Sequence, residues 1–345
     1  MQALLVQSPN EWNVSEVPVP QYGPDDVLVK VKYAGICHTD LEVLKGGVNE
    51  PYVKYPIIPG HEWVGIVEKC GESVKRFHPG DTVVVEGIIR CNHCYYCNTA
   101  RTNLCNNVKS IGYTHNGAFT EYVSAPQHVV HSLPSNVPLE IATLVEPTSV
   151  VLYALERANI GLAKTVAVIG PGPIGLLAVA MLKFYQPKEI ILIGTKDDDE
   201  RLAIGRRMGA TRTVNINEEE PFEVVQKLTN GFGVDHVFEC AGQEKAVELA
   251  FKIYARGGTV GIVGFMGGGQ KVYLSTDDMM LKNLRLSATY ASTTKAWVEA
   301  IRLLATGIVD VSPIITHTYQ LREARKALES VIARKKGVIK VLLKM

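Results

Sequence analysis

Residues 164–175, KTVAVIGPGPIG, join a short apolar run to a glycine-rich turn. The apolar run is typical of a buried strand, and the apolar residues after the turn, Leu176 to Phe184, are typical of a helix. A G-x-G-x-x-G turn that follows a strand and opens a helix has the context that dinucleotide binding requires. The segment therefore predicts a parallel α/β fold with a nucleotide cofactor at this turn.

Each residue of the turn has an expected role. Gly170 allows the tight turn, Gly172 lets a pyrophosphate approach the backbone, and Gly175 lets the helix pack closely on the strand. Pro173 and Ile174 stand where the N-terminus of the helix would face the phosphates. A generic glycine-rich turn is the alternative, and the βα units that follow in step count against it.

Strand-like and helix-like segments alternate after the turn. Together with the strand before the turn they supply six strands, enough for a complete doubly wound Rossmann sheet. The expected strands lie at 164–169, 190–193, 212–215, 234–239, 258–263 and 283–288, and the expected helices at 200–208, 221–228 and 244–254.

The chain before residue 150 has a different pattern. Short alternations of apolar and polar residues, such as 27–32 and 82–85, are broken by Gly and Pro, which predicts an irregular antiparallel β-rich domain. After residue 291 we expect two helices and a last strand that return to this domain. We therefore expect a catalytic domain formed by residues 1–152 and 290–345, with a dinucleotide-binding domain at 153–289 inserted into it.

Two short motifs in the β-rich half offer metal ligands. Cys37 offers a thiolate, His61 an imidazole and Glu62 a carboxylate. This mixed set suits a zinc ion that keeps an open position for catalysis. Thr39 would supply a hydroxyl beside the metal. A buried cysteine and a core histidine are the ordinary interpretation of either residue alone, and the accompanying motifs reverse that preference.

Four of the seven cysteines form a second pattern, Cys91-x2-Cys94-x2-Cys97-x7-Cys105. In a reducing compartment this spacing indicates a metal knuckle. Four thiolates close a tetrahedron around zinc and leave no vacancy, so the predicted role is structural. Disulfides are disfavoured because three cysteines within seven residues have poor bridging geometry. An iron–sulfur cluster is the other alternative, but the spacing departs from that of bacterial ferredoxins.

The composition excludes several other classes of protein. The 345 residues are 46% hydrophobic, and 36 basic residues balance 35 acidic ones for a net charge of +1. No long-range field would attract nucleic acid or an anionic membrane. The amino terminus lacks the features of a signal peptide, and no apolar run has the length of a membrane span. These observations lead us to expect a cytoplasmic protein.

The motifs together resemble zinc-dependent medium-chain alcohol dehydrogenases. The resemblance covers the whole chain, and Gly60-His61-Glu62 and Glu146-Pro147 are most similar to the polyol (sorbitol) and threonine dehydrogenase branch. It implies a GroES-like catalytic domain beside the Rossmann domain, and a homodimer or homotetramer. It also implies that Cys37, His61 and Glu62 hold the catalytic zinc, with Glu146 ligating directly or through water. Which glutamate is innermost stays open.

The expected chemistry is hydride transfer from an alcohol to a nicotinamide across the interdomain cleft. Zinc would make the bound hydroxyl acidic, and Thr39 would take its proton. Relatives carry a histidine at the relay position where this chain has Glu42. Either Glu42 or His38 could pass the proton on, and the sequence leaves the two open.

Cofactor choice depends on the end of the second expected strand. Thr195 and Lys196 stand where an acidic residue normally contacts the adenosine ribose, and Arg201 is a further cation nearby. These residues favour NADP slightly over NAD. The acidic run at 197–199 points the other way, because a shift of one residue would restore an acid.

Two carboxylates make a polar, hard pocket, which suits a sugar alcohol or its phosphate better than ethanol. Threonine or a simple secondary alcohol is the alternative substrate. A zinc-stabilised binding protein without enzymatic activity is a third interpretation. It has no use for Cys37, His61 or the glycine turn. A protein that kept the dehydrogenase fold without activity would be expected to have lost a metal ligand or Thr39, and neither has been lost.

Overall fold

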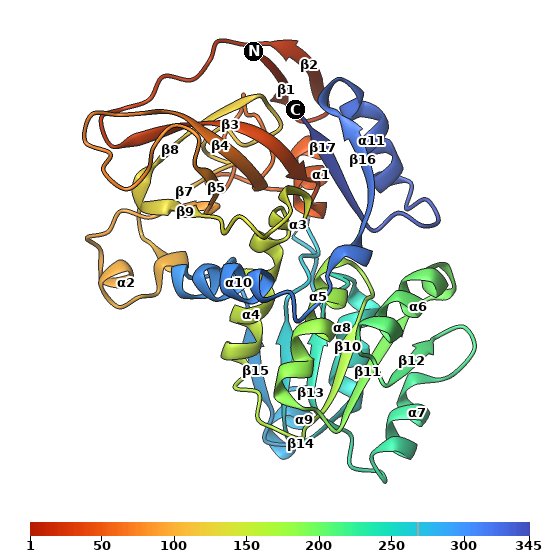
Figure 1. Cartoon of the computed structure of the whole chain (residues 1–345). Coiled ribbons are helices and arrows are strands. Elements are labelled where there is room, and N and C mark those ends of the chain that lie inside the picture. Colours follow the sequence, from red (N-terminus) through yellow and green to blue (C-terminus); the bar gives the residue numbers. More distant parts are fainter. Residues whose placement is uncertain (268) are drawn as a thin grey trace. The chain divides into compact units, whose positions relative to one another are not determined.

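A computed structural model describes residues 1–267 and 269–345 of the chain. The chain divides into two compact units, which are drawn in Figure 1. The first unit consists of Met1–Ser149, Ser292–Ile308 and Ile315–Met345, and the second consists of Val150–Ala291 and Val309–Ile314.

The first unit is built on a seven-stranded sheet of order β16-β17-β3-β4-β5-β9, in which β8 also pairs with β3. All of these pairs are antiparallel except β16 with β17. Two small sheets, β1 with β2 and β6 with β7, complete the unit. The strands are β1 (Gln2–Ser8), β2 (Glu11–Glu16), β3 (Asp26–Gly35), β4 (Glu62–Cys70), β5 (Thr82–Val85), β6 (Ile88–Ile89), β7 (Lys109–Ser110), β8 (Tyr122–Pro126), β9 (Val130–Ser132), β16 (Ile315–Gln320) and β17 (Lys340–Lys344).

Helix α1 carries the first metal-ligand motif, and local sequence determines both of its ends. Cys37 is the N-cap, and the Asp40 side chain accepts its backbone N–H in a capping-box arrangement. Gly46 ends the helix at φ 80°, a conformation that favours glycine. The helices of this unit are α1 (His38–Lys45), α2 (Tyr95–Asn98), α3 (Leu139–Ala142), α10 (Thr294–Thr306) and α11 (Ala324–Ile332), and α4 (Val145–Arg157) begins here and ends in the second unit.

The second unit contains a six-stranded parallel sheet of order β12-β11-β10-β13-β14-β15. The order reverses direction between β10 and β13, as in a doubly wound dinucleotide fold. β10, with the sequence TVAVI, is buried along its whole length, because the strands of a parallel sheet are covered on both faces. The strands are β10 (Thr165–Ile169), β11 (Glu189–Gly194), β12 (Arg212–Asn215), β13 (Val234–Glu239), β14 (Tyr254–Ile262) and β15 (Arg285–Ala288).

Helices pack along this sheet (Figure 1), and α5 with α6, and α7 with α8, form contacting pairs. α5 starts from Gly172 as N-cap with Pro173 in its first turn, a position that suits proline because no N–H is needed there. The helices are α5 (Pro173–Leu182), α6 (Asp199–Met208), α7 (Pro221–Leu228), α8 (Glu244–Ile253) and α9 (Thr276–Leu281). Short 3-10 turns lie at Thr102–Leu104, Gln127–Val129, Lys183–Tyr185, Lys196–Asp198, Ser312–Ile314 and Leu321–Glu323.

The predicted fold class, a β-rich domain with a doubly wound Rossmann domain, is confirmed. All six predicted strands of the parallel sheet are present. β14 begins at Tyr254 rather than 258, because Gly257 and Gly258 continue a strand where glycine usually breaks one. Helix α9 and strand β16 were not predicted, since neither has a clear apolar period.

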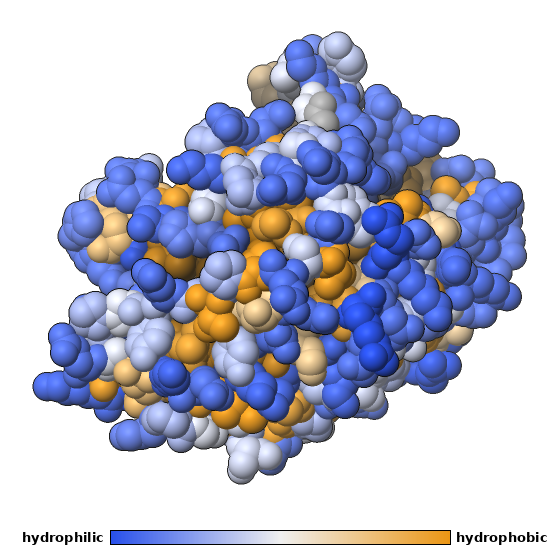
Figure 2. Space-filling view, turned by 90° about the horizontal axis from the view of Figure 1, so that it is seen from above, coloured by the Kyte–Doolittle hydropathy of each residue, from blue (hydrophilic) through white to orange (hydrophobic). Residues whose placement is uncertain are grey.

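One face of the molecule is mostly hydrophilic (Figure 2), and the described helices are short. Figure 2 shows a face on which hydrophilic side chains predominate and apolar ones gather near the centre. Among the helices of residues 1–267 and 269–345, none has both the length and the apolar character needed to cross a membrane.

Candidate active site and metal centres

The two separate ligand motifs come together in the first unit. Potential ligand atoms of Cys37, His61 and Glu62 all lie within 4.8 Å of one another. The pairing of β3 with β4 explains how, because it sets Glu62, the first residue of β4, opposite Gly35 near the start of α1. A Cβ atom on Gly35 would lie 2.4 Å from Glu62 Oε2, so this position has no room for a side chain. Thiolate, imidazole and carboxylate in one cluster fit a zinc ion.

Asp40 orients the cluster. It is fully buried, and its Oδ1 lies 3.2 Å from His61 Nδ1. The same side chain accepts the backbone N–H of Cys37 at 2.8 Å and that of Gly60 at 3.2 Å. Because Nδ1 of His61 faces a carboxylate, Nε2 is the nitrogen left for a metal. Sequence reasoning gave Asp40 no role, although its place three residues after Cys37 was a usable signal.

Tyr113 is a second neighbour that the sequence did not reveal. Its hydroxyl lies 3.4 Å from His61 Nδ1, and the two rings are 5.2 Å apart between centroids. Burial raises the pKa of Tyr113 well above its usual value, so the hydroxyl stays protonated at neutral pH. Tyr113 lies on a loop that has no recognisable motif, and only the folded chain brings it here.

A buried ion pair adjoins the ligands. Lys340 Nζ lies 2.8 Å from Glu62 Oε1 and 2.5 Å from Oε2, and it donates to the Ile36 carbonyl at 3.2 Å. Both side chains are 2% exposed. Burial acts to lower the pKa of Lys340, but Glu62, Cys37 and Glu146 together outweigh it and the pKa is raised. Sequence reasoning missed Lys340, because a lysine at each end of β17, KVLLK, is an ordinary strand pattern.

Glu146, in the first turn of α4, lies beside the cluster rather than within it. Within the described part of the chain, this group of mutually close ligand atoms consists of Cys37, His61 and Glu62 and does not include Glu146. Burial raises the pKa of Glu146 to about 7, with a further rise from Glu62 and opposite effects from His61 and Lys340. A second carboxylate therefore adjoins the cluster.

The expected proton-handling residues lie on α1. Thr39 Oγ1 is 3.6 Å from Cys37 Sγ, so its hydroxyl stands beside the ligand cluster. His38 Nε2 is 3.6 Å from Glu42 Oε1, one helical turn along. The side chain of His38 is 62% exposed and that of Glu42 is 15% exposed. α1 thus brings both candidate relay residues close to each other, with His38 toward solvent.

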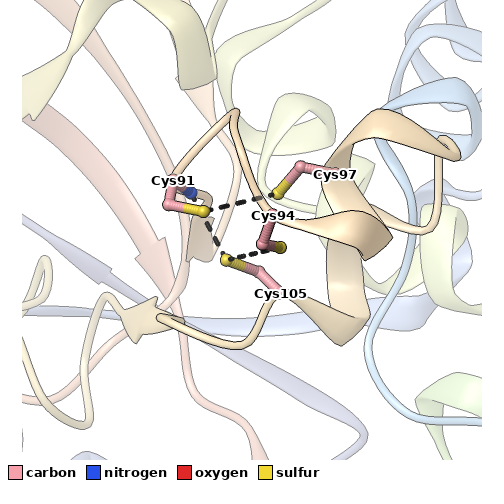
Figure 3. Close-up of side chains that lie close together, drawn as sticks. All are labelled: Cys91, Cys94, Cys97 and Cys105. Atoms are coloured by element: carbon pink, nitrogen blue, oxygen red, sulfur yellow. Dashed lines mark hydrogen bonds between the residues drawn. The ribbon is translucent and has the colours of Figure 1, made fainter.

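The four cysteines form a separate cluster (Figure 3), and their Sγ atoms all lie within 4.8 Å of one another. The Cys91–Cys97 and Cys94–Cys105 sulfur pairs are each 4.0 Å apart. A zinc tetrahedron with Zn–S bonds of roughly 2.3 Å has sulfur–sulfur edges of about 3.8 Å, so the cluster fits a closed zinc site. All four thiols are free, and backbone N–H groups of Cys97 and Asn106 lower the pKa of Cys94, which favours the thiolate.

In the glycine turn of the second unit, a side chain would not fit at Gly170 or Gly175. Gly170 has φ +100°, and a Cβ there would lie 2.8 Å from Ala241. A Cβ on Gly175 would lie 2.0 Å from the Gly170 carbonyl oxygen. By contrast, a Cβ on Gly172 would meet no atom of the described residues within 4 Å. The open side of the turn at Gly172, next to Pro173 and Ile174 at the start of α5, can therefore admit a phosphate.

The candidate ribose contacts follow β11. The Thr195 hydroxyl donates to Asp198 Oδ2 at 2.8 Å, and Arg201 Nη1 lies 3.4 Å from Asp198 Oδ1. Lys196 is exposed. Asp198 thus contacts both Thr195 and Arg201, two of the three residues that sequence reasoning proposed for cofactor selection. This acidic residue therefore lies among the expected contacts to the adenosine ribose.

Comparison with known proteins gives matches along most of the chain. Residues 23–135 match the alcohol dehydrogenase GroES-like domain and residues 173–306 the zinc-binding dehydrogenase family. Sorbitol dehydrogenase of Bacillus subtilis is 33% identical over 99% of this chain and 97% of its own length. L-threonine 3-dehydrogenase of the same organism is 34% identical over 92% and 90%. A zinc-binding dehydrogenase structure from Sinorhizobium meliloti 1021, bound to NADP, has a TM-score of 0.90 at 31% identity and covers 100% and 99% of the two chains.

Proposed function

The chain belongs to the zinc-binding dehydrogenase family, with an alcohol dehydrogenase GroES-like domain, and on that premise we propose that it oxidises a secondary hydroxyl of a sugar alcohol. It is an NAD(P)-linked, zinc-dependent oxidoreductase. The observation that carries the proposed function is the cluster of Cys37 with the buried His61 and Glu62, and with a second carboxylate, Glu146, beside it. We assign catalysis to the first unit and dinucleotide binding to the second.

We propose Cys37, His61 and Glu62 as ligands of the catalytic zinc. Lys340 would share the Glu62 carboxylate and balance its charge, while Glu146 would complete the site directly or through water. Asp40 would hold His61 in the orientation that presents Nε2. Bound there, zinc supplies a Lewis acid, and the nicotinamide supplies the acceptor for hydride.

The proton of the substrate hydroxyl would pass through this chain's own residues. Thr39 stands beside Cys37 and can accept the proton in a hydrogen bond. The His38–Glu42 pair on the same helix gives it a route outward, because His38 is exposed. This route uses the two groups in place of the relay histidine that relatives carry at position 42.

A second zinc ion would be held by Cys91, Cys94, Cys97 and Cys105, which gives two per chain. Four thiolates leave no open position, so this ion would stabilise the loop and take no part in the reaction. Free thiols held close together also suit a reducing compartment, and we propose a cytoplasmic location on that ground.

For the cofactor we propose binding at Gly170–Gly175, with a slight preference for NADP over NAD. The open side of Gly172 would admit the pyrophosphate, and Lys196 and Arg201 would contact a 2′-phosphate. The relative from Sinorhizobium meliloti was crystallised with NADP, which supports this preference. Replacement of Lys196 by Glu should raise the KM for NADP about tenfold and leave the KM for NAD within about twofold.

The substrate would be a polyol, free or phosphorylated. A site with two carboxylates suits a substrate whose neighbouring hydroxyl also approaches the metal. The similarity to sorbitol dehydrogenase supports this class, whereas the similarity to L-threonine 3-dehydrogenase favours threonine as the second candidate. No role for nucleic acid or membrane follows from the site.

We further propose a homo-oligomer, either a dimer or a tetramer. β15 ends the order of the parallel sheet, so its outer edge has no partner strand in the described part of the chain. Leu286 and Tyr290 are each 48% exposed on or near this edge. An exposed edge with apolar side chains favours pairing with a second copy.

Hydride transfer measured by nicotinamide absorbance tests the proposed function. Sugar alcohols, their phosphates, threonine and simple secondary alcohols should each be assayed with NAD and NADP, before and after chelation. We expect a polyol or polyol phosphate to be the best substrate, with activity that chelation removes and zinc restores. Activity restricted to threonine would replace the polyol proposal by the second candidate.

A further inference from the structure

Glu239, the last residue of β13, is a fully buried carboxylate that has no part in the roles assigned above. Its Oε1 accepts the backbone N–H groups of Ala241 and Gly242, each at 2.8 Å. Its Oε2 is also buried and has no hydrogen-bond partner within residues 1–267 and 269–345. Burial raises the pKa of Glu239, while backbone N–H groups of the turns after β13 and β14 oppose that rise and favour the charged form.

Three turns of the second unit meet around this carboxylate. β10, β13 and β14 are neighbours in the sheet, so their carboxyl ends lie side by side. The N–H of Cys240 donates to the Ile169 carbonyl at the end of β10, at 2.9 Å. The N–H groups of Val263 and Gly264 both donate to the Glu239 carbonyl at 2.9 Å. Glu239 thus connects the two turns, because its side chain accepts from the turn after β13 and its backbone carbonyl accepts from the turn after β14.

The turns after β10, β13 and β14 are closely packed against one another. A Cβ on Gly170 would lie 2.8 Å from Ala241, which one Glu239 bond holds in place. A Cβ on Gly242, at φ +61°, would lie 2.5 Å from a backbone oxygen of the turn after β14. A Cβ on Gly264 would lie 2.6 Å from Glu239 Oε2. Movement of the Glu239 carboxylate would therefore displace Ala241 against the Gly170 turn.

The position of the Glu239 carboxylate in the sheet connects it with ligand binding. Strand order reverses between β10 and β13, and ligands of open α/β sheets bind outside the carboxyl ends of the strands at such a point. Successive backbone N–H groups in a turn form a concavity that attracts anions. Here the concavity after β13 is already filled by the Glu239 carboxyl group, whose Oε1 accepts two of its N–H groups.

We propose that Glu239 is a positioning residue for the dinucleotide. Its carboxylate fixes the turn after β13 against the Gly170 turn, and it occupies N–H groups that would otherwise compete with α5 for the phosphates. The inference rests on the proposed NAD(P) binding at Gly170–Gly175.

The test compares Glu239→Gln with Asp235→Asn in the full-length protein. Asp235 lies near the other end of β13, where it accepts the Thr165 N–H at 2.9 Å and pairs with Lys164 at 3.2 Å. Each variant replaces a carboxylate by its amide and keeps one acceptor oxygen. For Glu239→Gln, titration with NAD and NADP should show a dissociation constant raised about tenfold, because the amide lacks the negative charge that strengthens the hydrogen bonds from Ala241 and Gly242. Asp235→Asn should change it less than about twofold.

Kinetics separate positioning from a general loss of structure. Glu239→Gln should raise the KM for the cofactor while kcat, the KM for the alcohol and the zinc content stay near wild type. Unchanged cofactor binding in Glu239→Gln, or equal losses in every parameter, would overturn the inference. If that variant does not fold, Glu239→Asp retains the charge with a shorter reach, and the same criteria apply to it. A wild-type protein that binds neither NAD nor NADP would instead overturn the proposed function, before any variant is compared.

Discussion

The two metal-ligand clusters of the first unit are built in opposite ways. The four cysteines come from one segment of 15 residues, 91–105, and their sulfur atoms meet because that loop folds back on itself. Cys37, His61 and Glu62 come from the start of α1 and the start of β4, and their neighbours Glu146 and Lys340 come from α4 and β17. One cluster is local, and the other is assembled by the fold.

The two clusters therefore depend on a bound metal ion to different degrees. The cluster of Cys37, His61 and Glu62, our proposed catalytic site, is held by protein contacts, since Asp40 bonds Cys37, Gly60 and His61 and Lys340 pairs with Glu62. The cysteine loop has fewer buried groups, with only Cys105 of its four ligands buried. A metal bound by the four cysteines would therefore contribute folding free energy to the loop, whereas a metal bound by Cys37, His61 and Glu62 would enter a site that is already formed.

The largest expected effect comes from removal of a ligand in the assembled cluster. His61→Ala should lower kcat/KM at least about 1,000-fold, because the Lewis acid contributes several kcal/mol to the transition state. The thermal midpoint should fall as well, because the fully buried Asp40 carboxylate loses its His61 partner, so activity is compared at a temperature where the variant is folded. His78→Ala is the matched control, as that side chain is 80% exposed, and it should retain wild-type activity. Activity of His61→Ala within tenfold of wild type would exclude this cluster as the catalytic site.

The next effect concerns the buried ion pair. Lys340→Met should lower the free energy of unfolding by about 3–5 kcal/mol, because it leaves the Glu62 carboxylate buried without a partner. Denaturant unfolding of the metal-free protein measures this change. The double variant Glu62→Gln with Lys340→Met should recover a substantial part of the loss. Strictly additive effects of the two substitutions would show that the pair does not couple.

A smaller effect is expected from the carboxylate that orients His61. Asp40→Asn should weaken zinc binding or lower activity about 10- to 100-fold, as is typical for the partner of a metal-bound histidine. Competition with a chromogenic chelator measures the affinity of the catalytic zinc. The four-cysteine zinc of the same variant is an internal control and should keep its affinity. Equal weakening at both sites would indicate a general structural defect instead.

The smallest effect should come from Tyr113. Its hydroxyl is 3.4 Å from His61 Nδ1, a long contact that contributes little. Tyr113→Phe should therefore change kcat/KM about threefold or less. A loss greater than about 30-fold would mean that Tyr113, rather than Asp40, is the main partner of the histidine.

Sequence reasoning succeeded where the determining interactions are local. The glycine turn, its flanking strand and helix, and the six strands of the parallel sheet follow from short-range pattern, and the structure has each of them. The proximity of four cysteines likewise follows from spacing alone. Cys37 and His61 could be paired from their residue types and the neighbouring motifs, although they lie 24 residues apart.

The neighbours of the catalytic cluster were harder to find, for a physical reason. Lys340 is 278 residues from Glu62, and only the pairing of β17 with β3 brings them together. Tyr113 lies on a loop without a motif. Asp40 could have been found, because its spacing from Cys37 matches a capping box at the start of a helix. Buried polar contacts across a sheet leave no periodic pattern in either partner.

Zinc content per chain, measured by mass spectrometry of metals in Cys37→Ser and Cys97→Ser, most directly tests the central claim of one catalytic and one structural site. We expect two zinc ions in the wild-type protein and one in each variant. Cys37→Ser should be inactive with a near-native thermal midpoint, whereas Cys97→Ser should keep activity within about tenfold and melt at a lower temperature. One zinc ion in the wild type, or an active Cys37→Ser variant, would contradict the assignment of the two clusters.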